Sequence, residues 1–345
     1  MPTAVPESVA SEPPVAVELE RTLDHLAKSL EPPEFSRHVA GICSTTEELD
    51  QLRAELATLR RNHDVLKSKF SDLSEEVRSA GNLQREMLDR PLPTICGATA
   101  NAVQRPAGPV SGDLCQVFRL DSHRIGILLA DATGHGVPAA LLTTYAKAFF
   151  CGPKSHALGA SPSARLEQLN EAIAAFDLTD CQFMTAVYAV FDERTRMLRW
   201  ARGGAPYPLL FRANGITTEL HGSGPILGIG AEAEFEDCEL QLEPGDVLML
   251  HTDGLDFLSD PHAPRPLVTA PATTCWSESL AGAGKPPVLD QLATIIAEAA
   301  SNGLLEDDIS IVTLAVDPPV GQPRGESVEL PTTIGPRDPQ YQAGT

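Results

Sequence analysis

Four short segments pair an aspartate with turn-forming residues, and together they could bind divalent cations. Each segment adjoins an apolar, strand-like run, so we expect the carboxylates to project from strand ends toward a common rim. An aspartate beside glycine is usually only a turn residue, because its side chain bonds its own backbone. The prediction therefore depends on the whole set: Ser111-Gly112-Asp113, Asp131-Ala132-Thr133-Gly134-His135-Gly136, Thr252-Asp253-Gly254 and Asp307-Asp308-Ile309-Ser310.

The ligand type restricts the chemistry. Carboxylates suit hard cations such as Mg²⁺ and Mn²⁺, whereas zinc favours His and Cys. Two cations held together lower the pKa of a shared water and neutralise charge on a phosphoryl group during in-line displacement. Such a site favours hydrolysis of a phosphate ester without a covalent phospho-enzyme.

The composition fits an acidic, cation-binding protein. The 345 residues carry a formal net charge of -21, which argues against a nucleic-acid or anionic-membrane partner, and 42% are hydrophobic, enough for a sizeable core. Seven cysteines are scattered without CxxC spacing, and no run approaches the ~20 apolar residues of a membrane span. The N-terminus lacks a signal-peptide pattern. We expect a soluble, cytoplasmic protein with reduced thiols.

The N-terminal part predicts a coiled coil. Residues 1–45 are expected to be mostly disordered, with a tail at 1–15 and a short helix at 16–30 that Pro32 and Pro33 terminate. Residues 46–90 keep a 3,4 spacing that predicts a homodimeric coiled coil; the alternative is one amphipathic helix packed on its own domain. Heptad position a takes Leu49, Leu56, His63, Phe70, Val77 and Gln84, and position d takes Leu52, Leu59, Leu66, Leu73, Ala80 and Met87.

The pattern of strand-like and helical segments in residues 94–317 predicts an α+β domain, a two-sheet β-sandwich flanked by helices. Hairpins are expected with turns at 121–123 and 192–195, and Pro244-Gly245-Asp246 forms a further turn before a strand. Helices are expected at 137–151 and 288–301. Residues 259–287 are loop-like, either a flap near the site or an inert insertion, and 318–345 are expected to be a disordered tail.

The ordered set SGD, DATGHGVPAALL, FMTAVYAVFD, GPILGIG, LEPGDVLMLHTDGL and EDDISIVTLAV resembles the SpoIIE-type phosphatases of the metal-dependent protein phosphatase (PPM) family. The resemblance covers about 94 to 316. It implies a helix-flanked β-sandwich that holds two Mn²⁺ or Mg²⁺ ions on aspartates, and a bridging water that attacks phosphoserine or phosphothreonine. Residues 84–93 also resemble the linker helix that joins such domains to upstream sensory regions.

The resemblance implies a role for each acidic residue. Asp131 matches the bridging aspartate, with the Ala132 carbonyl as a backbone ligand beside it. Asp253 and Asp307 match the ligands of the second metal. Asp113 matches the first acidic position, which acts on metal or on its water, and Asp308 orients its neighbour or exchanges roles with it.

Other positions leave alternatives open. His135 is either a proton donor to the leaving serine oxygen or a hydrogen-bonded turn residue, and Thr185 is expected to pack or to form a supporting hydrogen bond. Two positions depart from the family: Gln116 replaces a frequent acidic residue, and Ala205 replaces the His of GHPP. We expect altered rate or regulation from them. No phosphate-binding arginine is assigned; the candidates Arg105, Arg199 and Arg202 are expected to be surface residues.

Three functional hypotheses follow. The first is a serine/threonine phosphatase that acts on a phosphorylated regulatory protein and is regulated through the coiled coil. The second is a pseudophosphatase or partner-binding scaffold that retains the fold, which Gln116 and Ala205 favour and the four retained aspartates oppose. The third is a coiled-coil scaffold with a passenger domain.

Overall fold

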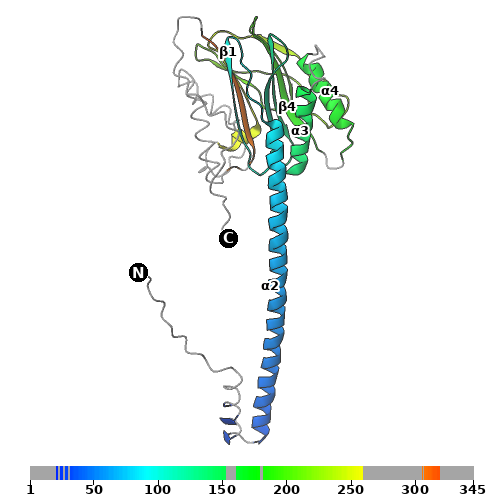
Figure 1. The fold of residues 1–345 in the computed structure, drawn as a ribbon, viewed down its shortest axis with the longest axis vertical. Helices are drawn as coiled ribbons and strands as arrows, with labels where there is room; N and C mark the ends of the chain where they lie inside the picture. The colour runs from blue at the N-terminus through cyan, green and yellow to red at the C-terminus, as the bar shows by residue number, and fades with distance from the viewer. Residues whose placement is uncertain are drawn as a thin grey trace, which may run out of the picture. The chain divides into compact units, whose positions relative to one another are not determined.

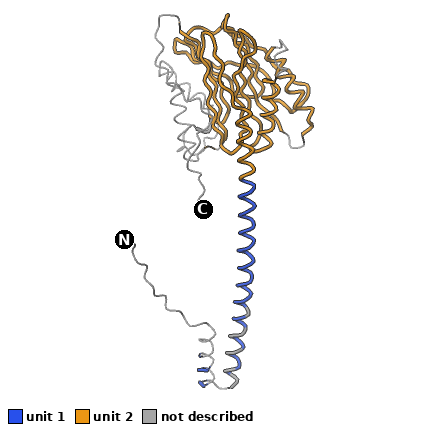
Figure 2. The backbone as a smooth tube through the Cα atoms, viewed as in Figure 1, with its two compact units in different colours: residues 1–74 blue, residues 75–345 orange. Residues whose placement is uncertain are grey.

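The computed structural model describes residues 21, 24–25, 28–29, 32–152, 161–178, 182–258, 305 and 307–318. The chain divides into two units, residues 1–74 and 75–345, which we describe separately (Figure 2). Several predicted segments lie outside the described residues. They are the tail at 1–15, the loop at 259–287, the helix at 288–301 and nearly all of the tail at 318–345.

A single helix, α2, runs from Pro32 to Leu88 over 57 residues (Figure 1). It begins at Pro32 rather than near residue 46, so the structure differs here from the predicted boundary at 45. Proline is tolerated in the first turn of a helix, because the N–H that it lacks would have no helical partner there. Pro32 and Pro33 therefore begin a helix, whereas the prediction used them only as a stop.

The predicted coiled-coil face of α2 is exposed in the single chain. Seven of its large apolar side chains, Leu49, Leu52, Leu56, Leu59, Leu66, Phe70 and Leu73, are between 50% and 74% exposed. Their surface would be buried by a second helix in a coiled coil. The homodimer stays a prediction.

The second unit contains two antiparallel five-stranded sheets, as the sequence predicted. One has the order β1-β10-β9-β6-β7 and the other β2-β3-β4-β5-β8. The first is formed by Ala98–Arg105 (β1), Ile309–Val316 (β10), Val247–His251 (β9), Leu209–Phe211 (β6) and Thr217–Glu219 (β7). The second is formed by Asp113–Arg119 (β2), Arg124–Ala132 (β3), Met184–Asp192 (β4), Met197–Gly203 (β5) and Cys238–Gln241 (β8).

Both predicted hairpins are confirmed, and aspartates close their turns. Asp121 Oδ1 accepts hydrogen bonds from the backbone N–H groups of His123 and Arg124, each at 2.8 Å. Asp192 Oδ1 accepts from the N–H groups of Arg194 and Thr195, each at 2.9 Å. These side chains replace backbone partners that the turn residues lack, so the registers of β2–β3 and β4–β5 are fixed locally.

The helices Val137–Cys151 (α3) and Pro162–Ala174 (α4) pack on the outer face of the second sheet (Figure 1). Strand side chains alternate between the faces. In β3, Leu128 and Ala130 pack in the cluster that includes these helices, whereas Ile127 and Leu129 fill the space between the sheets. Asp131 is the next residue on the same face of β3 as Ile127 and Leu129, so it lies at the open end of the space between the two sheets.

The Pro244-Gly245-Asp246 turn is present, and it provides a test of the fold. Gly245 has a φ of +90°, and Asp246 is 1% exposed. The Asp246 carboxylate accepts hydrogen bonds from Arg212 Nη1 at 2.8 Å, Glu243 N at 2.9 Å and Ala213 N at 3.2 Å. Asp246→Ala is expected to lower the free energy of unfolding by about 3 kcal/mol, because it leaves these donors without an acceptor.

Urea denaturation measures this effect, and Glu239→Gln is the matched control. Glu239 pairs with Arg199 at 3.4 Å, and both side chains are 63% exposed, so its loss should cost less than about 1 kcal/mol. Equal costs for the two substitutions would contradict the assigned role of Asp246.

Candidate metal centre

The registers bring all four acidic segments to one end of the sandwich. Asp113 lies opposite Asp131 in the β2–β3 pair. Asp253 follows the end of β9, and Asp307 precedes the start of the adjacent strand β10. The two sheets are joined at this rim by hydrogen bonds, so the candidate residues converge although they are far apart in the sequence.

Asp113 is held in place by Thr252, a residue to which the sequence analysis gave no role. Thr252 Oγ1 donates to Asp113 Oδ2 at 2.9 Å and accepts from Ser310 N at 2.9 Å. The hydroxyl thus connects β10, the end of β9 and the start of β2. The sequence signal was its place directly before Asp253 in the Thr-Asp-Gly segment.

The carboxylates raise one another's pKa. Burial raises the pKa of Asp113, which is 1% exposed, well above its usual range, and Asp131 adds repulsion. Burial and the charges of Asp253, Asp307 and Asp308 raise the pKa of Asp131 to about 7. The pKa of Asp307 is also raised, chiefly by burial. Negative charge concentrated in this way is relieved by a bound cation.

The carboxylates of these residues suit a metal centre chemically, although their present arrangement does not form a complete coordination shell. No three His, Cys, Asp or Glu side chains of the described residues form a ready-made metal cluster. The Ala132 carbonyl, the expected backbone ligand, lies 3.1 Å from the position that a Cβ on Gly112 would take. A side chain at residue 112 would crowd this oxygen, so glycine keeps the space open.

Asp308 is fully engaged in hydrogen bonds. Its Oδ2 accepts from Ser111 Oγ at 2.8 Å and Gly112 N at 2.6 Å, and its Oδ1 accepts from Ala107 N at 2.7 Å. These bonds fix the segment that precedes Asp113. They suit the orienting role expected for Asp308, and its alternative role as a ligand stays a prediction.

Asp308→Ala should therefore disturb the neighbouring segment. The substitution leaves two backbone N–H groups and one hydroxyl without their acceptor, which is expected to cost about 3 kcal/mol of folding stability. Thermal denaturation in EDTA measures it without any contribution from bound metal. Asp307→Ala is the control: Asp307 is only partly buried and, among the described residues, accepts one hydrogen bond, from Asp308 N at 2.8 Å, so its loss should cost less than that of Asp308. Equal losses would contradict the assignment.

Three glycines shape the backbone around the acidic segments. Gly134 and Gly136 both have φ values of +83°, which other residues rarely adopt, so the backbone turns sharply before α3 begins. A Cβ on Gly254 would lie 1.9 Å from the Asp308 carbonyl oxygen, so this glycine permits a close approach. His135 is exposed, and its charge offsets only a small part of the rise in the pKa of nearby Asp307, which leaves both of the roles expected for His135 open.

The end of α2 packs on the acidic rim through Gln84, and this corrects the predicted heptad. Gln84 is 6% exposed; its Nε2 donates to the Ser111 carbonyl at 2.8 Å, and its Oε1 accepts from Ser111 N at 3.0 Å. Gln84 Nε2 also lies 3.3 Å from Thr143 Oγ1 of α3. The coiled-coil position predicted for Gln84 is therefore wrong in this chain, because a tertiary contact buries the amide.

The residues that depart from the family have structural contacts. Gln116 is 7% exposed, and its Nε2 donates to the Leu88 carbonyl at the end of α2 at 2.8 Å. Ala205 is 4% exposed in the core between the sheets. Thr185 lies opposite Asp131 in the β3–β4 register. Neither Gln116 nor Ala205 lies among the acidic segments.

The two facing antiparallel sheets, the flanking helices and the acidic rim define a PP2C-type phosphatase fold. The family model for stage II sporulation protein E (SpoIIE) matches residues 121–317, so the chain belongs to the SpoIIE family. Solved structures agree on the fold. The SiaA-PP2C domain of Pseudomonas aeruginosa is 22% identical with a TM-score of 0.59, over 72% of this chain and 99% of that one. The phosphatase domain of Bacillus subtilis SpoIIE with a regulatory fragment is 18% identical with a TM-score of 0.51, over 64% and 62%.

Curated relatives are similar over part of their length. Phosphoserine phosphatase RsbU of Bacillus subtilis (strain 168) is 26% identical over 196 residues, 56% of this chain and 57% of that protein. Phosphoserine phosphatase RsbP of the same organism is 26% identical over 183 residues, 52% of this chain and 45% of that protein. The chain thus spans about half the length of these relatives. Within the described residues, no helix is both long and apolar enough to cross a membrane.

Proposed function

We propose that this chain is a metal-dependent phosphatase that removes phosphate from phosphoserine or phosphothreonine on a regulatory protein. One observation carries the proposal. The fold brings Asp113, Asp131, Asp253 and Asp307 to one rim, where burial and mutual repulsion raise the pKa of Asp131 to about 7. The names of RsbU and RsbP as phosphoserine phosphatases support the same substrate class.

In this proposal Asp131, the Ala132 carbonyl, Asp253 and Asp307 would hold two Mn²⁺ or Mg²⁺ ions. When bound, the ions supply an acidified water and neutralise charge on the phosphoryl group. Asp113 accepts a proton or a hydrogen bond at its Oδ1, because Thr252 occupies its Oδ2. His135 is exposed beside Asp307, which suits proton donation to the leaving serine oxygen.

We also propose regulation through α2. Gln84 contacts both backbone polar groups of Ser111, and Gln116 holds the Leu88 carbonyl. A movement of the end of α2 would therefore shift the segment that contains Asp113, because Gln84 is hydrogen-bonded to Ser111. The exposed seam from Leu49 to Leu73 supports a homodimer through the part of residues 46–90 that precedes the contact of Gln84 with Ser111. The net charge of -21 supports the expectation that nucleic acid and membranes are not partners, and the cytoplasmic location stays a prediction.

Hydrolysis of p-nitrophenyl phosphate with Mn²⁺, Mg²⁺ or EDTA tests the proposal, together with calorimetric titration of Mn²⁺. Turnover that requires Mn²⁺ or Mg²⁺ is the expected result. Mn²⁺ binding without turnover of this ester or of a phosphoserine peptide would favour the pseudophosphatase alternative. Turnover that persists in EDTA would overturn the metal mechanism.

A further inference from the structure

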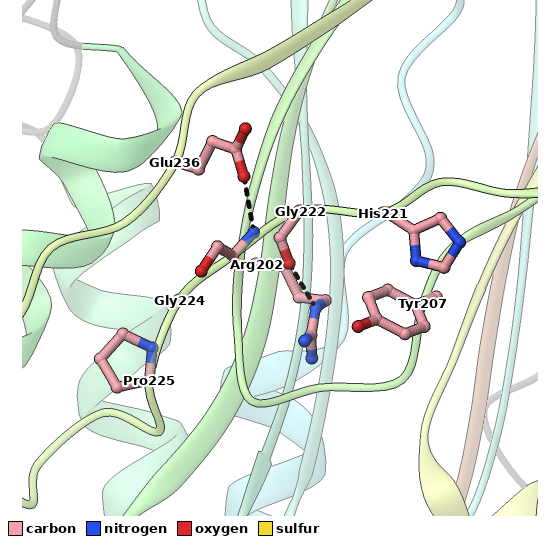
Figure 3. A pocket seen from close by; sticks show the side chains of 8 residues that line it. Arg202, Tyr207, His221, Gly222, Gly224, Pro225 and Glu236 are labelled. Atoms are coloured by element: carbon pink, nitrogen blue, oxygen red, sulfur yellow. Dashed lines mark hydrogen bonds between the residues drawn. The ribbon is translucent and has the colours of Figure 1, made fainter.

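A cavity of about 560 Å³ opens beside the strand β5, outside the candidate metal centre (Figure 3). It lies between the end of β5 with its following segment, 202–207, and the segment 221–225, with Glu236 on its wall. Figure 3 shows Arg202 between Tyr207 and His221 on one side and Glu236 on the other. Neither the fold nor the proposed hydrolysis explains this group of polar and aromatic side chains.

The guanidinium of Arg202 is fixed by its neighbours. Its Nε donates to the Gly222 carbonyl at 3.1 Å, and its Nη1 donates to the Ala205 carbonyl. The guanidinium carbon lies 4.3 Å from the centre of the Tyr207 ring, and that ring packs edge-on against His221 at 4.5 Å. An arginine held in this way loses little side-chain entropy when it binds a ligand.

The charge of Arg202 has no acidic partner among the described residues. Glu236 lies in the same cavity, but its Oε2 accepts from Ser223 N at 2.9 Å and forms no ion pair with Arg202. Two edges of the guanidinium are occupied by carbonyls, and Nη2 has no hydrogen-bond partner in the described part of the chain. A half-buried guanidinium with one open edge is suited to bind an oxyanion.

The cavity lies at the same end of the sandwich as the acidic rim. Gly204 bridges to Ala186, the neighbour of Thr185, and Thr185 lies opposite Asp131. In the other sheet, the segment before β6 runs beside the end of β9, because Leu209 pairs with Met249. Two strand spacings, on the order of 10 Å, separate β3 from β5. An extended peptide covers that distance with roughly three residues.

We propose that this cavity binds a carboxylate side chain of the phosphorylated substrate, about three residues from the phosphoserine. The Arg202 guanidinium receives the carboxylate, and Tyr207 keeps the guanidinium in place. The inference rests on the proposed phosphatase function and extends it, since Arg202 makes the enzyme selective for acidic residues that flank the phosphorylated serine.

Phosphoserine peptides that differ only at flanking positions test this inference. One set carries Glu two to four residues before or after the phosphoserine, and the matched set carries Lys at the same places. With wild-type protein and Mn²⁺, kcat/KM for the best Glu peptide should exceed that of its Lys counterpart by about tenfold, the effect of one charge-assisted hydrogen bond.

Substitutions test whether Arg202 causes the preference for the Glu peptides. Arg202→Glu should reverse the order of the two peptides, and Arg202→Lys should keep a reduced preference for Glu. Arg199→Ala is the matched control, because Arg199 lies on the same strand, is 63% exposed and pairs with Glu239. It should keep the wild-type ratio. Tyr207→Ala, which frees the guanidinium without removing it, should reduce the ratio even if Arg202→Glu does not fold.

The outcomes separate the two proposals. Metal-dependent turnover with equal kcat/KM for the Glu and Lys peptides overturns the cavity assignment and leaves the phosphatase intact. The cavity assignment is also overturned if Arg202→Lys and Tyr207→Ala both leave the preference for Glu peptides unchanged. No turnover of p-nitrophenyl phosphate or any peptide by the wild-type protein overturns the phosphatase function and this inference with it.

Discussion

Replacing Asp131 with Asn is expected to lower kcat/KM for a phosphoserine peptide by roughly a thousandfold, because several kcal/mol of transition-state stabilisation depend on the metal ions. Asp131 lies opposite Asp113, and the negative charges of Asp253 and Asp307 raise its pKa. A carboxylate in this position would help to hold the metal ions, and a neutral amide would bind them more weakly. Steady-state kinetics over a range of Mn²⁺ concentrations measures the loss.

A stability measurement shows whether this loss is caused by misfolding. The pKa of Asp131 is raised from 3.8 to about 7 in the folded chain, so without metal its ionisation destabilises the fold progressively as pH rises from about 4 to 7. Asp131→Asn removes that cost. In EDTA at pH 8 the variant should be more stable than wild type toward urea, although it is inactive. A variant that is both inactive and less stable would contradict the assignment.

Gly81→Ala is expected to disrupt the packing of the end of α2 against the backbone at Pro109. A Cβ on Gly81 would lie 1.8 Å from the Pro109 carbonyl oxygen, so the helix or the backbone before Ser111 must move. Overpacking of this kind costs about 1 to 3 kcal/mol. Because Gln84 and Ser111 are bonded beside this contact, activity toward a phosphoserine peptide should also fall, by about tenfold or more.

Gly41→Ala is the matched control for this substitution. Gly41 lies in the same helix, and a Cβ there would meet no atom within 4 Å. Alanine is favoured over glycine inside a helix by about 1 kcal/mol, so Gly41→Ala should stabilise the protein slightly and leave activity unchanged. Urea denaturation and kinetics compare the two variants. If Gly81→Ala behaves like Gly41→Ala, the proposed contact between α2 and the rim is wrong.

The two-sheet fold could be predicted because its signals are local. The hairpin turns at Asp121 and Asp192 are closed by hydrogen bonds to residues two and three positions ahead, and alternation of apolar side chains marks the strands. The start of the long helix was misplaced for the converse reason. Pro32 satisfies the rules for both the end and the beginning of a helix, and in the structure it begins α2.

The acidic residues of the candidate site could be predicted from the sequence, but the hydrogen bonds that position them could not. Motif spacing identifies Asp113 and Asp131, whereas the contact of Thr252 with Asp113 joins residues 139 positions apart. Ser111 and Asp308 are 197 positions apart. Gln84 continued the heptad spacing, which hid its tertiary contact with Ser111. Pattern analysis cannot detect such bonds, because neither partner lies within the other's local sequence.

Release of inorganic phosphate from a phosphoserine peptide by the full chain, followed against Mn²⁺ concentration, tests the central claim most directly. The rate is expected to rise to saturation with Mn²⁺, to fall to background in EDTA and to be lost in Asp131→Asn. Calorimetric uptake of Mn²⁺ should weaken in the same variant. Phosphate release that is unaffected by EDTA, or that survives Asp131→Asn at the wild-type rate, would contradict a phosphatase built on these aspartates.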